Sequence, residues 1–320
     1  MFDIEIEDDN TTEQVREHLQ RNLHRTIPYD NTDLSRLDTD VTDSLITAEE
    51  VKNIINKLKK TSPGKSGINK KILTHLPDNA IKRLTNIYNN TLSAGYFPDK
   101  WKQAILRLIP KEGKSPHTPQ NYRPISLLEV PGKILERVVN TRLKIHLENN
   151  NMYNPNQFGF RNHRGTTHAL AIVSEKIAQL KGDNGQCQVI LRDVTKAFDQ
   201  VWHCGLMYKI QQLLLPTTIE KFLCDFLSDR TASVKIKKKY VGPPFNLNCG
   251  VPQGSVLSPT LYTIFTNDME NSIRHVNISY ADDITQIIGY QGKSKNMLNR
   301  QSEREIMAVN RYEKKLENQN

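Results

Sequence analysis

The chain has 320 residues, of which 37% are hydrophobic and 25% are charged, so it is long enough to bury a core in two or three folded lobes. No apolar run approaches the ~18 residues that a membrane-spanning helix needs, and the acidic N-terminus lacks the charge pattern of a secretory signal. Length, composition and charge therefore argue against membrane insertion and secretion.

Charge is distributed unevenly along the chain, whose formal net charge is +9. Residues 1–50 hold 14 acidic and 4 basic residues, which leaves 40 basic and 21 acidic residues in 51–320. A body this basic suits a polyanion, because lysine and arginine contacts to phosphates release counterions. A solvated basic surface would have the same composition, so charge proposes a nucleic acid without deciding it.

The first half of the sequence predicts an acidic segment followed by helices. Residues 1–45 are polar and are expected to form a linker. A helix is predicted within 44–60, because Thr47 is followed by acidic residues and by an apolar stripe at helical spacing. Three further elements are expected in this half, namely helices over 81–93 and 132–147 and an apolar strand over 104–110.

The second half is richer in short β-forming runs. A run over 188–191 ends two residues before Asp193. Two hairpins are predicted, one with strands over 231–236 and 244–248 around three lysines, and one with strands over 276–280 and 284–288 around a tight turn. Helices and strands are mixed without a regular βαβ order, so the predicted fold class is α+β.

Three carboxylates stand out because their surroundings are apolar and β-forming. Asp193 ends one run, and Asp282 and Asp283 lie in the last hairpin. If neighbouring strands carry them, they could converge and would need divalent cations to offset their repulsion. Simpler interpretations stay open, since aspartates are common in hairpin turns and Asp193 could cap a helix over 195–201.

Five ordered blocks of sequence are more specific indicators of function than the composition. They resemble the motifs of non-LTR (LINE-type) retrotransposon reverse transcriptases, and most of all those of jockey-type elements, from about residue 46 to the last residue. The blocks are NYRPISLL at 121–128, QFGFR at 157–161, LRDVTKAFD at 191–199, GVPQGSVLSP at 250–259 and YADD at 280–283.

The resemblance implies the fingers and palm of a right-hand polymerase. The fingers would cover 46–182 and the palm, with an antiparallel sheet, 183–320, so that the reverse transcriptase domain spans about 95–320. The last residues resemble the opening of a further palm motif, and the thumb is expected to be missing. No endonuclease domain precedes residue 1, so we expect a fragment or a truncated copy.

The resemblance also assigns a metal site. Asp193, Asp282 and Asp283 would be its catalytic carboxylates, and the backbone carbonyl of Val194 could complete the coordination of two Mg²⁺ ions, with Mn²⁺ as an alternative. Arg192 stands where the family usually has a small or apolar residue. Strand alternation should turn it away from Asp193.

The resemblance places further residues around a nucleotide. Phe198 would act as a steric gate against a 2′-hydroxyl, while basic and loop residues would hold the triphosphate and base pair. Without the resemblance these would be a core aromatic, solvated charges and a simple turn. Asp199 would be structural. The nucleotide-binding residues are Lys111, Arg123, Phe198, Gln253 and Gly254, and the template-binding residues are Gly159 and Arg161.

The implied function is RNA-directed DNA polymerase activity with dNTP substrates, a template RNA and a DNA primer, within a nuclear and cytoplasmic ribonucleoprotein. The primer 3′-hydroxyl would attack the α-phosphorus, and pyrophosphate would leave. The alternatives are an intron-maturase-type reverse transcriptase, an RNA-dependent RNA polymerase, which Phe198 disfavours, and an inactive truncated copy acting at most as an RNA-binding remnant.

Overall fold

The computed structural model describes most of the chain beyond residue 43, and its backbone forms two units. The described residues are 44–59, 61–115, 117–182, 185–194, 196–237, 239–269, 275–292 and 294–318. Unit 1 combines Met1–His146 with Phe198–Ser258, and unit 2 combines Leu147–Ala197 with Pro259–Asn320. The predicted boundary at 182/183 therefore falls inside unit 2, because each unit is assembled from two separated segments. The predicted acidic linker over 1–45 lies almost wholly outside the described residues.

The helices predicted for the first half are confirmed in unit 1. Helix α2 (Ala48–Lys57) begins where Thr47 Oγ1 accepts a hydrogen bond of 3.1 Å from the amide of Glu50, which is the geometry of a helix N-cap. Helices α4 (Asp78–Ser93) and α6 (Val130–Asn149) extend a few residues beyond the predicted ranges. The remaining helices of unit 1 are α3 (Lys70–Thr74), α5 (Asp99–Lys102), α8 (His203–Gln211) and α9 (Thr217–Leu227).

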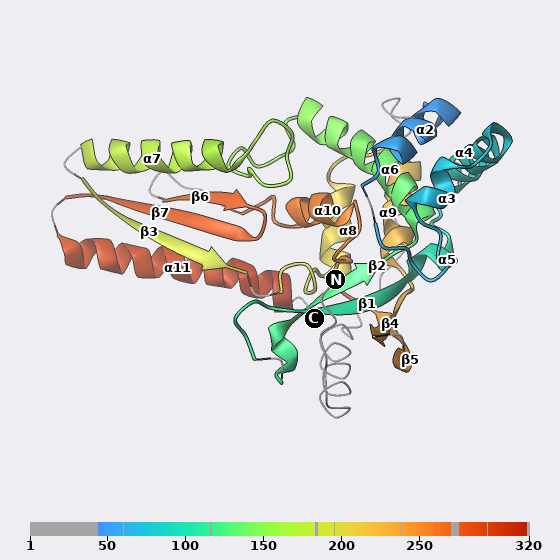
Figure 1. The fold of residues 1–320 in the computed structure, drawn as a ribbon. Helices are drawn as coiled ribbons and strands as arrows, with labels where there is room; N and C mark the ends of the chain where they lie inside the picture. Colours follow the sequence, from blue (N-terminus) through green and yellow to red (C-terminus); the bar gives the residue numbers. More distant parts are fainter. Residues whose placement is uncertain are drawn as a thin grey trace. The chain divides into compact units, whose positions relative to one another are not determined.

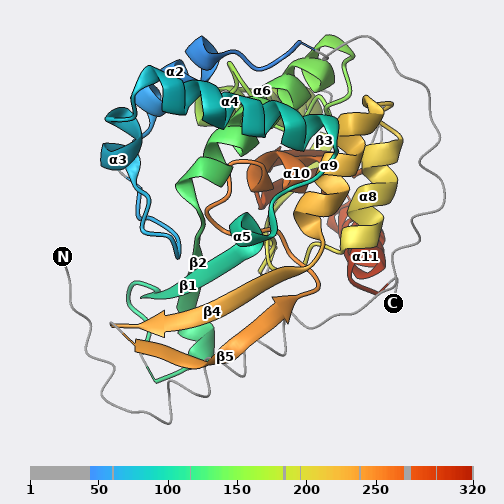
Figure 2. The ribbon, with the colours of Figure 1, turned by 90° about the vertical axis from the view of Figure 1, so that its right-hand side faces the viewer.

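A four-stranded sheet of order β2-β1-β4-β5 completes unit 1 (Figure 2). Its strands are β1 (Gln103–Pro110), β2 (Tyr122–Leu127), β4 (Arg230–Ile236) and β5 (Lys239–Leu247), and the short helix η1 (Pro119–Asn121) precedes β2. The central pair β1–β4 is parallel, and the outer pairs are antiparallel. The predicted basic hairpin is confirmed with a longer second strand, since Ile236 already pairs with Lys239.

Unit 2 is built on a wholly antiparallel sheet of order β3-β7-β6. Its strands are β3 (Gly185–Asp193), β6 (His275–Tyr280) and β7 (Asp283–Gln291), and helix α10 (Ser258–Phe265) precedes β6 in the chain. Helices α7 (Thr166–Gly182) and α11 (Lys295–Asn318) cover opposite faces of this sheet (Figure 1). The central strand β7 is therefore buried on both sides, and Ile287 of β7 packs in a core with Phe158 and Ala169. The α+β prediction is confirmed.

The segment after Asp193 differs from one sequence-based interpretation. Residues 196–200 form turns, and Lys196 has a positive φ of 54°, so a helix does not follow within 196–201. The next helix, α8, begins at His203 with Trp202 at its N-cap position. Asp193 is therefore not a helix cap. Its strand instead continues through the full predicted run and ends at the aspartate itself.

No helix in the part of the chain that the structure describes combines the length and the apolar character needed to cross a lipid bilayer.

Candidate active site

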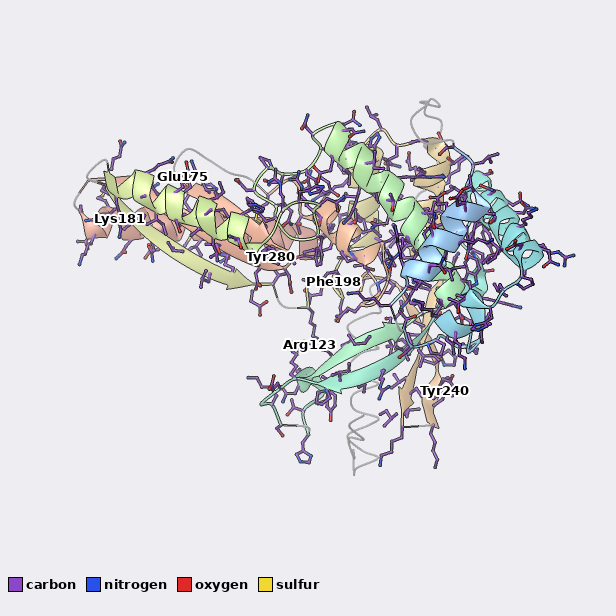
Figure 3. The ribbon with its side chains drawn as sticks, turned by 45° about the horizontal axis from the view of Figure 1, so that its top comes forward. Arg123, Glu175, Lys181, Phe198, Tyr240 and Tyr280 are labelled. Atoms are coloured by element: carbon purple, nitrogen blue, oxygen red, sulfur yellow. The ribbon has the colours of Figure 1, made fainter. Side chains whose placement is uncertain are left out.

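The β3–β7 pairing brings two of the predicted catalytic carboxylates to directly opposite positions. Asp193, the last residue of β3, is the register partner of Asp283, the first residue of β7. Asp282 precedes Asp283 in the turn that closes the β6–β7 hairpin, where Tyr280 pairs with Asp283. Figure 3 labels Tyr280 at this end of the sheet. Asp193 and Asp283, 90 positions apart in the sequence, are thus neighbours at one end of the sheet.

The same register separates Arg192 from the carboxylates. Arg192 pairs with Ile284, and its guanidinium donates to Asn310 Oδ1 at 2.7 Å and to the carbonyl of Ile306 at 3.4 Å, both in α11. Asp193, one residue on, projects from the opposite face because side chains alternate along a strand. The prediction that Arg192 turns away from Asp193 is confirmed.

The three carboxylates are accessible to solvent, but their side chains do not converge on one point. Asp193 and Asp283 are exposed and Asp282 is partly buried. Within the described ranges, no three acidic, histidine or cysteine side chains are close enough together to hold a metal ion. Like charges repel, and such side chains separate unless a cation lies between them. Their oxygen donors are those that Mg²⁺ prefers, so the residue types fit a magnesium site.

The turn that carries Asp282 is braced by the segment 156–159. The amide of Ser279 donates to the carbonyl of Asn156 at 2.9 Å, and the amide of Phe158 donates to the carbonyl of Ser279 at 2.8 Å. A Cβ atom added to Gly159 would lie 2.1 Å from the backbone nitrogen of Ala281, which itself has a φ of +62°. Gly159, predicted to bind template, therefore also packs against the backbone of the YADD turn.

Arg161, the other predicted template-binding residue, has extensive internal contacts. Its guanidinium forms two hydrogen bonds to the carboxylate of Glu148, at 3.1 and 2.6 Å, and a third to the carbonyl of Asn154 at 3.1 Å. It also lies 4.5 Å above the ring of Tyr153. The side chain is only 8% exposed. These contacts give Arg161 a structural function, and its template-binding function stays a prediction.

Two predicted phosphate-binding residues lie on one face of the β1–β2 hairpin in unit 1. Arg123 of β2 is exposed and is the register partner of Ile109. Lys111 follows β1 two residues after Ile109, and its amide donates to the carbonyl of Asn121 at 2.7 Å. If the alternation of β1 continues one residue past its end, Lys111 projects from the same face as Ile109 and Arg123. Figure 3 labels Arg123 on β2.

The GVPQG loop brings the other predicted nucleotide residues to the same unit. The carbonyl of Gln253 accepts a 2.7 Å hydrogen bond from the amide of Ser126 in β2. Gly254 has a φ of +123°, and a Cβ there would lie 2.6 Å from the carbonyl oxygen of Ser126, so only glycine fits this close approach. The carbonyl of Phe198 accepts from the amide of Val251 at 2.7 Å, which fixes Phe198 beside the loop.

Sequence reasoning missed two residues that hold this loop. Glu136 of α6 is buried, and its Oε2 accepts hydrogen bonds from Ser255 Oγ, from the Val256 amide at 2.7 Å and from the Leu257 amide at 3.4 Å. An acidic residue inside the apolar run of α6 was the available signal. The other residue is His203, which follows the LRDVTKAFD block by four positions. One of its ring nitrogens, Nε2, donates to the carbonyl of Gly250 at 2.7 Å, and burial lowers the pKa of His203 to about 4.

Comparison with known proteins gives the class first. Residues 109–309, more than half of the chain, match the family model of reverse transcriptase (RNA-dependent DNA polymerase). The chain belongs to the reverse transcriptase family.

Comparison with individual curated proteins shows which members of this family the chain resembles. The chain is 35% identical over 296 residues to the RNA-directed DNA polymerase from mobile element jockey of Drosophila melanogaster, an alignment covering 89% of this chain and 30% of that protein. It is 36% identical over 248 residues to the probable RNA-directed DNA polymerase from transposon BS of the same species, covering 75% and 27%. The jockey polymerase of Drosophila funebris is 38% identical over 251 residues, again covering 75% and 27%.

These matches confirm the resemblance to retrotransposon reverse transcriptases of the jockey group. The chain spans less than a third of the length of these curated relatives.

Proposed function

We propose that this chain carries the catalytic core of an RNA-directed DNA polymerase of a non-LTR retrotransposon, which adds dNTPs to a primer 3′-hydroxyl on an RNA template. The single observation that carries the proposal is the pairing of Asp193 with Asp283, one residue from Asp282, at the end of an antiparallel sheet. In this proposal that sheet belongs to the palm, within 183–320, and the fingers cover 46–182.

The three carboxylates and the carbonyl of Val194 are the proposed metal ligands. Divalent cations held there, two Mg²⁺ ions in our proposal, would promote loss of the proton from the primer hydroxyl and offset negative charge on the triphosphate. The sheet contributes rigidity, because Asp193 and Asp283 are fixed by the β-ladder and Asp282 by a hairpin turn packed on Gly159. A rigid arrangement of ligands avoids the cost of reorganising them during the reaction.

The residues of unit 1 are proposed to bind the incoming nucleotide. Arg123 and Lys111, which share a face of the β1–β2 hairpin, would contact its phosphates, since both keep a positive charge at neutral pH. Gln253 and Gly254 would contact the nucleotide through the loop that docks on β2. Phe198 would exclude a 2′-hydroxyl by its bulk, which makes deoxynucleotides the substrates.

The test is primer extension by the chain on an RNA template with Mg²⁺ and dNTPs, comparing the parent with Asp282→Asn. We expect the variant to lose incorporation by about 10²–10³-fold or more, the scale on which removal of one electrostatic contact to a transition state acts. Template–primer binding, measured separately, should be largely retained, because asparagine has the same shape.

Asp268→Asn is the matched control, since Asp268 is an exposed aspartate of unit 2 outside the YADD hairpin. It should leave incorporation unchanged. Equal incorporation by Asp282→Asn and by the parent would rule out the carboxylate assignment. Salt-sensitive RNA binding by a parent chain that incorporates no nucleotide would instead favour the alternative function, an RNA-binding remnant.

A further inference from the structure

Two acidic residues, Asp199 and Glu136, anchor the loop Gly250–Leu257. At its start, Asp199 Oδ1 accepts a 2.8 Å hydrogen bond from Gln253 Nε2, and a Cβ on Gly250 would lie 2.7 Å from the Asp199 carbonyl oxygen. At its end, Glu136 accepts the three hydrogen bonds described above. The loop therefore depends on two acidic side chains, of which Glu136 is buried and Asp199 is partly buried.

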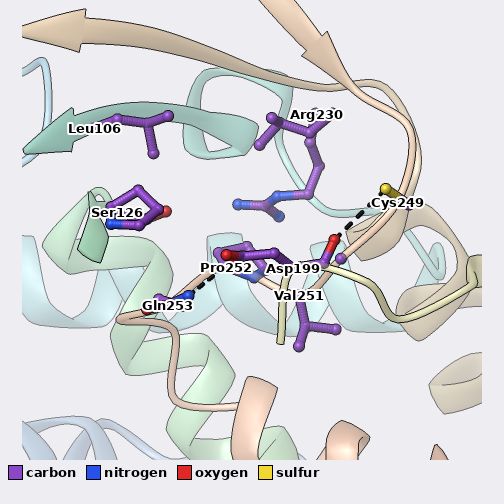
Figure 4. Close-up of a pocket in the computed structure, with 11 residues that line it drawn as sticks. Leu106, Ser126, Asp199, Arg230, Cys249, Val251, Pro252 and Gln253 are labelled. Carbon is purple, nitrogen blue, oxygen red and sulfur yellow. Dashed lines mark hydrogen bonds between the residues drawn. The ribbon is translucent and has the colours of Figure 1, made fainter. Parts of the chain in front are cut away.

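One buried cation lies among these anchors. Arg230, the first residue of β4, is 1% exposed and lines a pocket together with Asp199, Gln253 and the loop residues 249–252. Figure 4 shows its side chain reaching into this pocket toward Asp199 and Pro252. Its Nη1 donates to the carbonyl of Phe226 at 2.8 Å, and its guanidinium lies 4.6 Å from the centre of the Phe226 ring.

The other two nitrogen atoms of this guanidinium point to an electrostatic function. Nε and Nη2 of Arg230 are buried and have no hydrogen-bond partner among the residues that the structure describes. A fully buried arginine with unpaired donors costs several kcal/mol unless nearby negative charge offsets its desolvation. Burial lowers the pKa of Arg230, and the charge of Glu136 opposes that lowering.

We propose that Arg230 is a positioning residue of the polymerase. It supplies buried positive charge beside the loop Gly250–Leu257, which offsets the negative charge of the two acidic residues that anchor this loop, Asp199 and Glu136, and so fixes Gln253 and Gly254. The effect on catalysis rests on the proposed function of Gln253 in nucleotide binding. The effect on the loop itself does not, because it follows from contacts within unit 1 alone.

The loop is tested by amide hydrogen exchange of the whole chain. Arg230→Met keeps the bulk and removes the charge, and we expect exchange of residues 249–257 to become about tenfold faster or more. Arg230→Lys keeps the charge and should restore most of the protection. Faster exchange in 249–257 that is equal for the lysine and methionine variants would show a packing function only, and unchanged exchange in Arg230→Met would overturn the proposal.

A double-mutant cycle isolates the charge interaction. Glu136→Gln and Arg230→Met should each lower the midpoint of thermal unfolding. The decrease in the double variant should be smaller than the sum of the two single decreases, because the double variant removes both members of the pair. Additive losses would contradict the proposal. Glu129→Gln is the matched control, since Glu129 is also a buried acceptor but binds Ser66; this variant should leave exchange at 249–257 unchanged.

Kinetics separate this proposal from the function on which it partly rests. In primer extension, Arg230→Met should raise the KM for dNTPs severalfold with a smaller change in kcat. Arg230→Lys should have a KM close to that of the parent. Faster exchange of the loop together with an unchanged KM would support the effect of Arg230 on the loop. It would contradict the proposed function of Gln253 in nucleotide binding.

Discussion

Arginine residues at three positions show how strongly local surroundings decide what a side chain does. Arg123 is exposed on a strand, and Arg161 is held by Glu148 and Tyr153. Arg230 is buried, with two donors that find no partner within the described part of the chain. Sequence motifs proposed nucleic-acid or nucleotide contacts for the first two. The structure gives the second a full set of internal partners, and it singles out Arg230, for which no motif gave a signal.

The buried environment of His203 predicts how the stability of the protein depends on pH. Its pKa is lowered to about 4 by burial and by the charge of Arg230, whereas an unfolded chain has a histidine pKa near ~6.5. Between these values the unfolded chain binds more protons, so the free energy of unfolding is highest above pH ~6.5 and falls as the pH drops toward 4. We expect a loss of about 2 kcal/mol, less than the full shift implies, because His203 as a whole residue keeps partial exposure to solvent.

Chemical denaturation from pH 7 to 4 measures this effect. His203→Gln, whose amide can still donate to Gly250 but does not titrate, should show a flatter dependence across the same range. Parallel curves for the parent and this variant would show that His203 does not contribute.

At the scale of elements, the β6–β7 hairpin depends on a segment that is distant in sequence. Residues 156–159 run beside β6 through hydrogen bonds to Ser279, and Gln157 is buried with its Oε1 accepting from the Gly159 amide at 3.1 Å. The motif QFGFR is therefore explained in part by support of the YADD turn. This support is independent of any template contact that Gly159 also makes.

Gly159→Ala tests that support. The new methyl group would meet the backbone of Ala281 rather than a flexible side chain, so the turn or the 156–159 segment must shift. We expect destabilisation by about 1–3 kcal/mol in thermal or chemical unfolding, the usual cost of overpacking. We also expect loss of primer extension, because Asp282 would move with the turn.

Gly165→Ala is the control for this experiment, since a Cβ at Gly165 meets nothing within 4 Å and its φ is not positive. It should be nearly neutral. If the two alanine variants proved equally stable, the close packing of Gly159 on the turn would be wrong.

At the scale of the whole molecule, basic charge is the property most directly linked to nucleic-acid binding. The β4–β5 hairpin presents exposed Lys237 and Lys239, and Tyr240 is 51% exposed with Lys235 Nζ 5.2 Å from its ring centre. Basic and aromatic side chains together suit a single-stranded nucleic acid, which offers phosphates and stacking surfaces.

Binding of a fluorescent template–primer at several salt concentrations tests this surface. Replacing Lys237 and Lys239 by glutamine should weaken binding and reduce the slope of log K against log salt by about 1–2, because each lost phosphate contact contributes ~0.7–0.9. The same change at Lys71 and Lys100, exposed lysines of α3 and α5, is the matched comparison. Equal slopes for both double variants would exclude a particular function of the hairpin.

The sequence by itself determined the α+β class, the strands around Asp193 and the YADD turn, the cap of α2 and the family, because these depend on local spacing and on ordered motifs. It could not determine that Asp193 faces Asp283 in register, that Gly159 packs on Ala281, or that Arg230 and Glu136 flank one loop. Those relations join residues far apart in the chain, and only close packing of the folded backbone decides them. The two discontinuous units follow from the same cause, since long-range strand pairing, and not chain order, assigns each segment to its unit.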